Sequence, residues 1–204
     1  MTIERGREWG GEGVVPSDLV VVSRDREACR TVLGGAPVSV IGGDLALTIG
    51  STAAPAVGAT ARALPIDVLE VVMSRSSGEV RTAAVAHVVV SNPWWRGGRW
   101  RGETSFVMNV EYLAGRDVAP RGHPNDGRFE VVSVAREMNL RQRSIAWRRS
   151  RLGNHLPHPM LRLRSESRLV VVGTRLVVAV DGRRWRGVGR VEVAVRPDAG
   201  TVWA

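Results

Sequence analysis

Residues 109–132 read Asn-Val-Glu-Tyr-Leu-Ala-Gly-Arg-Asp-Val-Ala-Pro-Arg-Gly-His-Pro-Asn-Asp-Gly-Arg-Phe-Glu-Val-Val. Glycine and proline recur through the middle of this stretch, and Asn125-Asp126-Gly127 leads directly into an apolar run. These residue types favour turns, because Gly, Asn and Asp tolerate left-handed backbone and Pro fixes φ. The stretch therefore predicts a long irregular connection that ends where a strand begins.

Short β runs flank this connection on both sides. They are predicted at residues 66–74, 79–91, 106–113, 128–136, 160–164, 168–172, 175–180 and 190–196. In the last run, Val191, Val193 and Val195 alternate with polar or small residues, as in a strand with one face in water. One helix is predicted between Asn139, as its N-cap, and Gly153, as its stop. The spacing predicts an antiparallel β-sandwich with one helix.

Residues 16–62 follow a different pattern. An apolar run at 18–23, a polar helical stretch at 25–33 and a second apolar run at 38–41 predict a βαβ unit. We therefore expect an α+β, mostly-β chain with a disordered terminus at 1–15, a partial α/β lobe at 16–62 and the sandwich at 63–204. Gly42-Gly43-Asp44 follows the second strand, where α/β folds bind ligands.

The charge of the chain is carried by arginine. The 29 basic residues are all Arg, against 20 Asp plus Glu, and the excess lies beyond residue 80. Such an excess indicates an anionic partner: nucleic acid, an anionic membrane surface or a phosphorylated ligand. Codon bias towards arginine is the alternative explanation.

The cysteine content, the apolar runs and the missing motifs limit the cellular compartment and the enzyme classes that fit this sequence. Cys29 is the single cysteine, so no disulfide within the chain and no cysteine-rich zinc module can form. No signal-peptide pattern and no run of 18 apolar residues is present, and we expect a cytoplasmic protein. Gly-x-Ser-x-Gly and His-Glu-x-x-His motifs are absent. Gly187-Val188-Gly189 is interpreted as a hairpin turn, and His155 and His158 as structural or surface residues.

Two arginine-rich segments are candidates for an anionic surface. The first, residues 94–101, is called the Trp/Arg loop below and alternates rings with guanidinium groups. Its candidate residues are Trp94, Trp95, Arg96, Arg99, Trp100 and Arg101. The second is the predicted helix, with Arg148 and Arg149. Both suit a bilayer interface or a nucleic acid. The alternative is a hairpin loop whose tryptophans fold back over the sheet.

Several motifs, in their order along the chain, resemble those of the diacylglycerol kinases and related bacterial lipid kinases of the NAD kinase-like superfamily. The matching segments are Gly42–Gly50, Asn109–Val132 with its Ala-Pro and Asn-Asp-Gly, Gly153-Asn154-His155, Val180-Asp181-Gly182 and Val195–Ala199. The resemblance covers residues 16–204. It implies an ATP-dependent lipid kinase fold whose truncated nucleotide-binding lobe is residues 16–62.

The resemblance also implies sites for ATP and Mg²⁺. Gly42, Gly43 and Asp44 would contact the nucleotide or its metal. Asp126 would offer a carboxylate to Mg²⁺, and His123 and Arg128 would offer carbonyls. Two simpler interpretations stay open: Asn125-Asp126-Gly127 is only a turn, and Asp44 only caps the helix that follows.

The chain departs from the family pattern where catalysis depends on it. No equivalent of the family's Gly-Gly-Asp-Gly-Thr phosphate loop is found before Gly42. The turn Asp181-Gly182 is kept, but Arg183 replaces the Glu that is the family's proposed base, and Arg cannot accept a proton. The segment between His87 and Asn109 is also shorter than in the family.

These observations lead to three functional hypotheses. The first is a divergent lipid-kinase-family protein, catalytically impaired on its own, that binds anionic lipid or a partner subunit and lies in the cytoplasm or peripherally at the membrane. The second is an active lipid kinase completed by a partner chain or a second copy. The third is a module that binds nucleic acid without sequence preference.

Overall fold

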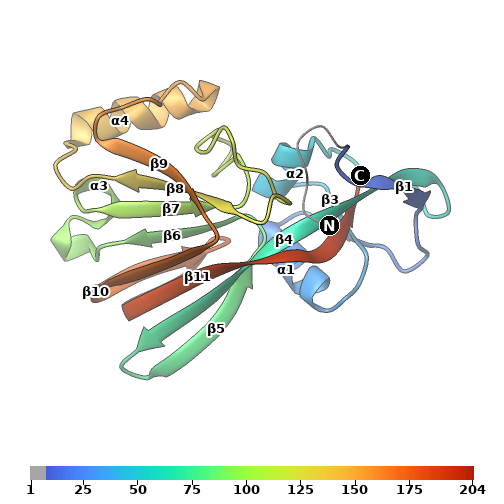
Figure 1. Ribbon diagram of the computed structural model, residues 1–204, viewed down its shortest axis with the longest axis horizontal. Helices are drawn as coiled ribbons and strands as arrows, with labels where there is room; N and C mark the ends of the chain where they lie inside the picture. Colours follow the sequence, from blue (N-terminus) through green and yellow to red (C-terminus); the bar gives the residue numbers. More distant parts are fainter. Residues whose placement is uncertain (1–7) are drawn as a thin grey trace.

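The computed structural model describes residues 8–204, with α1 and α2 at one end of a large β-sheet and α3 and α4 at the other (Figure 1). The strands are β1 (Gly11–Val14), β2 (Val20–Val22), β3 (Val38–Val40), β4 (Thr60–Arg75), β5 (Gly78–Ala84), β6 (His87–Ser91), β7 (Thr104–Met108), β8 (Phe129–Val134), β9 (Leu161–Glu166), β10 (Arg168–Val180) and β11 (Arg183–Trp203). The helices are α1 (Asp25–Leu33), α2 (Asp44–Ile49), α3 (Gly98–Arg101) and α4 (Leu140–Arg149), with 3₁₀ turns η1 (Trp94–Arg96) and η2 (Ser150–Leu152).

Hydrogen bonds join these strands into one open sheet. The strand order is β1-β4-β11-β10-β6-β7-β8-β9, with β5 paired to β4. The short strands β2 and β3 are parallel to each other, and β3 is parallel to the end of β11. All other pairs are antiparallel. The α+β, mostly-β class is thus confirmed, but the strands share one sheet where we expected a sandwich of two layers.

The long β10–β11 hairpin shows how one sheet can cover both sides of a core. Near its base, Val193 of β11 pairs with Val71 of β4. Trp185, near its tip, lines a pocket together with the same Val71. Residues 185 and 193 would lie roughly 26 Å apart in a straight strand, so the hairpin must fold back. The strand register shifts between Val172 and Leu176, which marks the bend.

The bend corrects one expectation from the sequence. Gly187-Val188-Gly189 is not a hairpin turn but lies inside β11, and Gly187 has φ 72°. The turn of this hairpin is instead Asp181-Gly182, as predicted, and both residues have positive φ. A glycine pair inside a strand fits a bend, because glycine accepts the backbone angles of a bulge.

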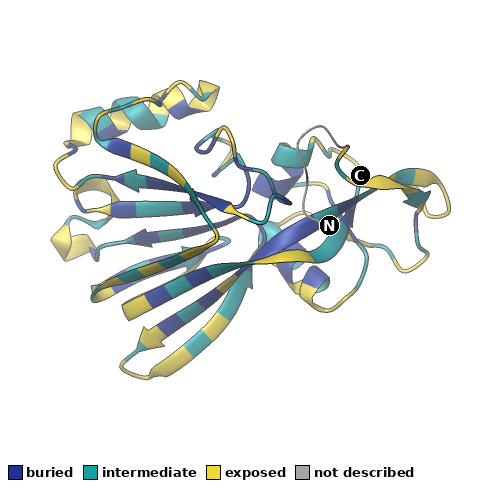
Figure 2. Ribbon diagram, viewed as in Figure 1, coloured by how far each residue is buried: buried dark blue, intermediate teal, exposed yellow. Residues whose placement is uncertain are grey.

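Buried and exposed residues alternate along several strands (Figure 2). The largest cluster of buried side chains extends across the sheet from β4 to β8 and includes Leu69, Met73, Val107 and Phe129. A second cluster joins α1, α2 and β3 to Ile66 and Val68 of β4 and to Val202 at the end of β11. The α/β segment therefore shares a core with the main sheet, and β4 crosses the predicted boundary at 62/63.

The predicted disorder of residues 1–15 is corrected for part of this segment. Residues 11–14 form β1, which pairs with β4 in regular register. Main-chain hydrogen bonds to an existing strand do not require an apolar pattern, which explains why composition missed this strand. Residues 1–7 lie outside the described part of the chain.

The predicted helix after Asn139 is confirmed. Asn139 accepts a hydrogen bond from the backbone of Gln142, and the Gln142 side chain accepts one from the backbone of Asn139. This reciprocal capping box satisfies two donors that a helix start leaves open. Within residues 8–204, no helix is both long and apolar enough to cross a membrane.

Asp67 holds two distant segments against the middle of β4. Its buried carboxylate accepts hydrogen bonds from the backbone N–H of Gly127 at 2.8 Å and of Asp198 at 2.9 Å, and from Asn125 Nδ2 at 3.2 Å. The Asn125-Asp126-Gly127 turn is therefore fixed to β4 through a carboxylate that lies about 60 residues away in sequence.

We expect Asp67→Ala to lower the free energy of unfolding by about 3 kcal/mol, because it leaves several buried donors without an acceptor. Urea denaturation followed by tryptophan fluorescence measures this change. Asp18→Ala, at an exposed position, is the matched control and should have little effect. Equal stabilities for the two variants would contradict the assigned role of Asp67.

Candidate functional site

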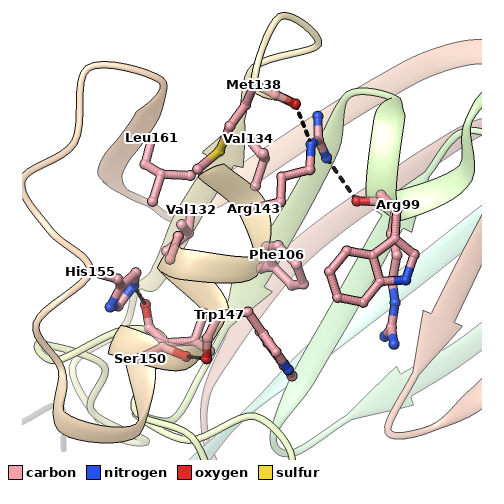
Figure 3. A pocket seen from close by; sticks show the side chains of 13 residues that line it. Arg99, Phe106, Val132, Val134, Met138, Arg143, Trp147, Ser150, His155 and Leu161 are labelled. Carbon is pink, nitrogen blue, oxygen red and sulfur yellow. Dashed lines mark hydrogen bonds between the residues drawn. The ribbon is translucent and has the colours of Figure 1, made fainter. Parts of the chain in front are cut away.

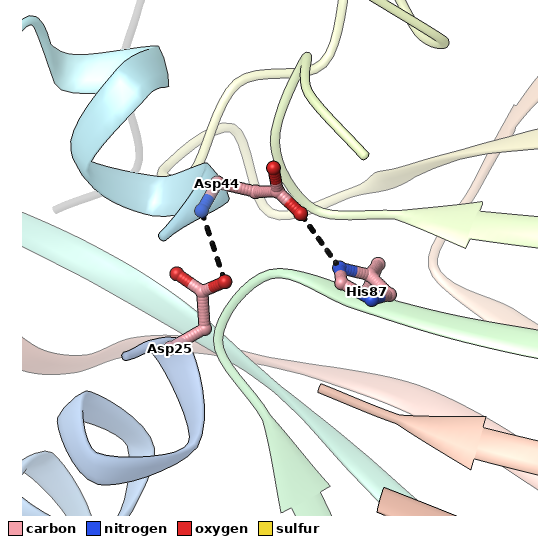
Figure 4. A group of neighbouring side chains, drawn as sticks. All are labelled: Asp25, Asp44 and His87. Atoms are coloured by element: carbon pink, nitrogen blue, oxygen red, sulfur yellow. Dashed lines mark hydrogen bonds and ion pairs between the residues drawn. The ribbon is translucent and has the colours of Figure 1, made fainter. Parts of the chain in front are cut away.

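Three chemistry-bearing side chains meet where the α/β segment contacts the main sheet (Figure 4). Asp25 is the first residue of α1, directly after β2, and Asp44 is the first residue of α2, directly after β3. Because β2 and β3 are parallel, both carboxylates reach the same edge of the sheet. His87, at the start of β6, brings its Nδ1 to 3.7 Å from Asp44 Oδ2. Asp44 and His87 are both buried.

Each of the two carboxylates binds backbone N–H groups of another segment. Asp25 accepts hydrogen bonds from the N–H of Asp44 and of Leu45, at 2.9 and 3.0 Å. Asp44 accepts them from Ala114 and Gly115, at 2.9 and 3.1 Å. The interpretation of Asp44 as the cap of its own helix is therefore wrong. Asp25 caps α2, and Asp44 fixes the loop after β7.

This arrangement bears directly on nucleotide binding. Gly42, Gly43 and Asp44 line an open pocket of about 450 Å³, but the first N–H groups of α2 are already bound to Asp25. A Cβ on Gly43 would collide with the Asp25 carboxylate. A phosphate at this helix start would have to displace a carboxylate, and Asp44 would repel it. These residues do not fit the phosphate cradle that the resemblance implies.

The same cluster has the composition of a cation site. The ligating atoms of Asp25, Asp44 and His87 all lie within 4.8 Å of one another. His87 Nδ1 is buried and has no hydrogen-bond partner. Two carboxylates and one imidazole suit a first-row divalent metal, whereas Mg²⁺ prefers oxygen ligands alone. These three residues could therefore hold a divalent cation.

Asp181 lies beside this cluster, at the tip of the β10–β11 hairpin. Its carboxylate accepts hydrogen bonds from the backbone N–H of Val85, Ala86 and His87, at 2.9, 3.2 and 3.0 Å. Burial is the main cause that raises its pKa, to about 6, while His87 and the backbone donors lower it. Asp181 therefore fixes the tip of the hairpin to the start of β6.

Arg183, which follows the Asp181-Gly182 turn, is exposed. Its guanidinium lies over the Trp185 ring, 4.9 Å from the centroid. A guanidinium keeps its proton, so Arg183 places a permanent positive charge next to the turn.

The residues of the metal site predicted around Asp126 contact neighbouring protein groups. Asp126 Oδ1 accepts a hydrogen bond from the Arg128 backbone at 2.9 Å, and His123 packs edge-on against Trp9. Burial, with the nearby Asp67 and Glu130, raises the pKa of Asp126 to about 6. In the described part of the chain, metal-ligating side chains converge at Asp25, Asp44 and His87, and not at Asp126. The turn forms without a cation, and a metal here stays a prediction.

The Trp/Arg loop forms η1 and α3 rather than an open hairpin loop. Its tryptophans do not fold back fully: 79% of Trp94, 55% of Trp95 and 40% of Trp100 is exposed. Arg148 and Arg149, in the last turn of the neighbouring helix α4, are exposed as well. Both predicted anionic-surface segments therefore lie at the same end of the molecule (Figure 1).

An apolar pocket lies beneath α4 and reaches this loop (Figure 3). It encloses about 70 Å³, less than the site of a whole lipid or drug-sized ligand. Its apolar walls come from β7, β8, β9 and α4. The walls are formed by Trp100, Phe106, Val118, Val132, Val134, Met138, Ala146, Trp147 and Leu161.

Arg143 closes one end of this pocket. Although buried, it donates hydrogen bonds to the carbonyls of Met138, Arg99 and Ala135, at 2.7, 2.7 and 2.8 Å. A buried guanidinium is tolerated because these carbonyls replace its water. Arg143 thereby connects α4 to the Trp/Arg loop.

The histidines after α4 have structural roles, as predicted. His155 is buried, and its Nε2 lies 3.1 Å from the Val118 carbonyl. His158 Nδ1 accepts a hydrogen bond from the Met160 backbone at 3.1 Å.

No protein-family model and no curated protein matches this sequence. Among solved structures, a diacylglycerol kinase from Bacillus anthracis str. Sterne matches with a TM-score of 0.53 and 13% identity, over 91% of this chain and 77% of that chain. The fold of this chain is similar to that of this diacylglycerol kinase. At this identity the match establishes the fold and not the activity. Yeast NADH kinase complexed with NADH gives a TM-score of 0.43 at 12% identity, over 92% of this chain and 61% of that chain, which is too weak to support an argument.

Sequence reasoning missed three residues that the structure places at these sites, Asp25, His87 and Asp67. Asp25 had a usable signal: it follows the first of two parallel strands, just as Asp44 follows the second, and such strand ends meet. His87 and Asp67 sit inside β runs with no local pattern to mark them. Their partners are more than 40 residues away in sequence.

We expect the stability of the protein to fall as pH rises from about 4 to about 6. An unfolded Asp titrates near 3.9, whereas Asp181 in the fold titrates at about 6. The folded state therefore keeps a proton that the unfolded state has lost in this window, and the stability it provides disappears as pH passes the higher value.

Asp181→Asn should flatten this dependence, because Asn cannot titrate. Urea denaturation at stepwise pH, followed by tryptophan fluorescence, compares the variant with wild type and with Asp18→Asn, at an exposed position. Identical pH profiles for Asp181→Asn and wild type would contradict the assignment.

Proposed function

We propose that this protein binds lipid at anionic membrane surfaces and that its phosphoryl-transfer centre is impaired when the chain is alone. The observation that carries the proposal is the apolar pocket beneath α4, which shares Arg99 and Trp100 with the exposed Trp/Arg loop. Tryptophan at a bilayer interface, next to arginine at the headgroups, is a common membrane contact.

In this proposal the pocket accepts one end of an acyl chain. Its lining is apolar at the centre, and its polar groups, such as Arg143 and Ser150, are hydrogen-bonded to the backbone. A volume of about 70 Å³ has room for part of a chain only. The rest of the lipid would stay in the bilayer against which the Trp/Arg loop lies.

Two observations support impaired phosphoryl transfer by the isolated chain. Asp25 occupies the N–H groups that would bind a phosphate at α2. Arg183 stands where the resemblance places a proton-accepting carboxylate, and phosphoryl transfer to a hydroxyl needs such an acceptor. ATP and Mg²⁺ are therefore not part of the proposed function of the isolated chain, although a divalent cation could bind at Asp25, Asp44 and His87.

Membrane binding is tested by co-sedimentation with vesicles of phosphatidylcholine, with and without phosphatidylserine. We expect binding only with the anionic lipid. Trp94→Ala with Trp95→Ala should weaken it by about tenfold or more, since each exposed ring loses its apolar contact. Leu47→Ala is the matched control, because Leu47 is 53% exposed on α2, far from the loop.

Two results would contradict the membrane proposal. One is equal binding to both kinds of vesicle with tight, salt-sensitive binding to single-stranded DNA, which would favour the nucleic-acid module. The other is an equal effect of the tryptophan variant and the Leu47→Ala control.

The impairment is tested with purified protein, ATP, Mg²⁺ and diacylglycerol. We expect no phosphatidate above background. Phosphate transfer by the isolated chain would overturn the proposal. A known bacterial diacylglycerol kinase serves as the positive control for the assay.

A kinase completed by a partner is the second candidate, and the edge of the parallel strands favours it. Among the strands of residues 8–204, β2 pairs only with β3, and Val20 and Val21 on this edge strand are 39% and 47% exposed. An unpaired edge can accept another strand. Activity that appears when the protein is recovered with its partners from cell extract, and not in the pure chain, would support this candidate.

A further inference from the structure

A second pocket, separate from the one beneath α4, lies between α1, the β4–β5 hairpin and the tip of the β10–β11 hairpin. It has a volume of about 540 Å³, in the range of small-molecule sites. Four arginines line it: Arg26, Arg30, Arg81 and Arg183. We call it the arginine groove.

Most of the positive charge in the arginine groove is not neutralised. In residues 8–204, Arg81 pairs with Glu79 at 2.8 Å, whereas no ion pair involves Arg26, Arg30 or Arg183. Glu70 is the one carboxylate among the lining residues. The acids in the first turn of α1 are engaged elsewhere, Asp25 with α2 and Glu27 with Arg24 at 3.7 Å.

The position of these arginines costs stability. Arg26 and Arg30 are four residues apart on α1, so they lie on the same face of the helix and repel each other by a few tenths of a kcal/mol. Arg183, at the start of β11, adds a third unpaired charge to the same groove. A bound anion would reverse this repulsion, since opposite charges attract most strongly where water is partly excluded.

Neighbouring residues hold Arg183 in place in the arginine groove. Arg183 follows the Asp181-Gly182 turn, and the Asp181 carboxylate binds three backbone N–H groups. The Arg183 guanidinium rests on Trp185. Guanidinium groups bind phosphate through paired hydrogen bonds, and a guanidinium that is already oriented loses less entropy on binding.

Apolar residues line the arginine groove together with the arginines. They include Leu33, Val72 and Trp185. Inorganic phosphate would contact only the arginines, whereas a molecule with an apolar part attached to its phosphate would contact both kinds of residue.

We propose that the arginine groove binds a phosphate monoester that carries an apolar group. This site is independent of the membrane contact proposed above, because its ligand is recognised through its phosphate in solution. The position that the resemblance assigns to a proton acceptor thus becomes part of an anion site through Arg183.

The test is isothermal titration of the whole protein at low salt with soluble ligands below their micelle concentration. The phosphorylated probes are dihexanoyl phosphatidate, AMP and inorganic phosphate, and dihexanoylglycerol is the unphosphorylated control. We expect saturable binding of phosphatidate or AMP, weaker binding of inorganic phosphate and none of dihexanoylglycerol. Whichever of the first two binds more tightly identifies the source as lipid or nucleotide.

Substitutions test whether the ligand binds in the arginine groove. Arg183→Gln, and separately Arg26→Gln with Arg30→Gln, should each weaken binding by about tenfold or more, as expected for the loss of hydrogen bonds to a charged group. Arg162→Gln, an exposed arginine on β9 outside the groove, should leave it unchanged. Circular dichroism melting curves exclude variants that fail to fold.

Three outcomes would overturn the proposal: no saturable binding of any phosphorylated probe, equal binding of dihexanoyl phosphatidate and dihexanoylglycerol, or equal losses in the groove variants and Arg162→Gln. None of them depends on the vesicle experiment. Failure of this site and failure of the membrane proposal are therefore distinguishable.

Discussion

Buried and half-buried carboxylates bound to distant backbone N–H groups hold this fold together. Asp25 fixes the start of α2, Asp44 the loop at Ala114, and Asp181 the start of β6. Burial raises the pKa of Asp25 and of Asp181, and the backbone donors oppose that rise. A carboxylate in such a place is stable only while its donors stay in position, because an unpaired buried charge costs several kcal/mol. The helices of the α/β segment and the tip of the β10–β11 hairpin are therefore fixed to one another through these contacts.

This structural use of carboxylates changes what the chain can do chemically. In a phosphoryl-transfer site, carboxylates hold cations and accept protons, and N–H groups at helix starts hold phosphates. Here Asp25 and the first N–H groups of α2 satisfy each other. Groups available for a ligand include the imidazole nitrogen Nδ1 of His87, which has no hydrogen-bond partner, and the arginines of the groove. These groups differ in character from the carboxylates and helix N–H groups of a phosphoryl-transfer site.

Local pattern was enough to predict α1, the parallel strands β2 and β3, the capped helix α4 and most β runs, since each follows from periodicity and from turn or cap residues. The site depended on contacts that no local pattern records. Asp181 lies 94 residues from the His87 backbone that it binds, and the bend that folds the β10–β11 hairpin back over β4 is visible in the sequence only as scattered glycines. The helix-cap role expected for Asp44 belongs to Asp25 for the same reason: the two residues are 19 apart, and only the parallel pairing of their strands brings them together.

Arginine, the one basic residue type in the chain, acts in three physically different ways. Arg143 is buried and donates to three carbonyls, so it contributes to packing and offers no charge to a ligand. Arg148 and Arg149 are exposed in solvent at the end of α4, where each would contribute about 1 kcal/mol to the proposed attraction by an anionic surface. Arg183 is exposed but lies against the Trp185 ring in a groove that apolar residues also line, where the effective dielectric constant is lower than in water and a single anion gains more. Net charge alone therefore does not identify the partner, because the surroundings of each guanidinium decide whether it supports the fold, attracts a surface or binds one ligand.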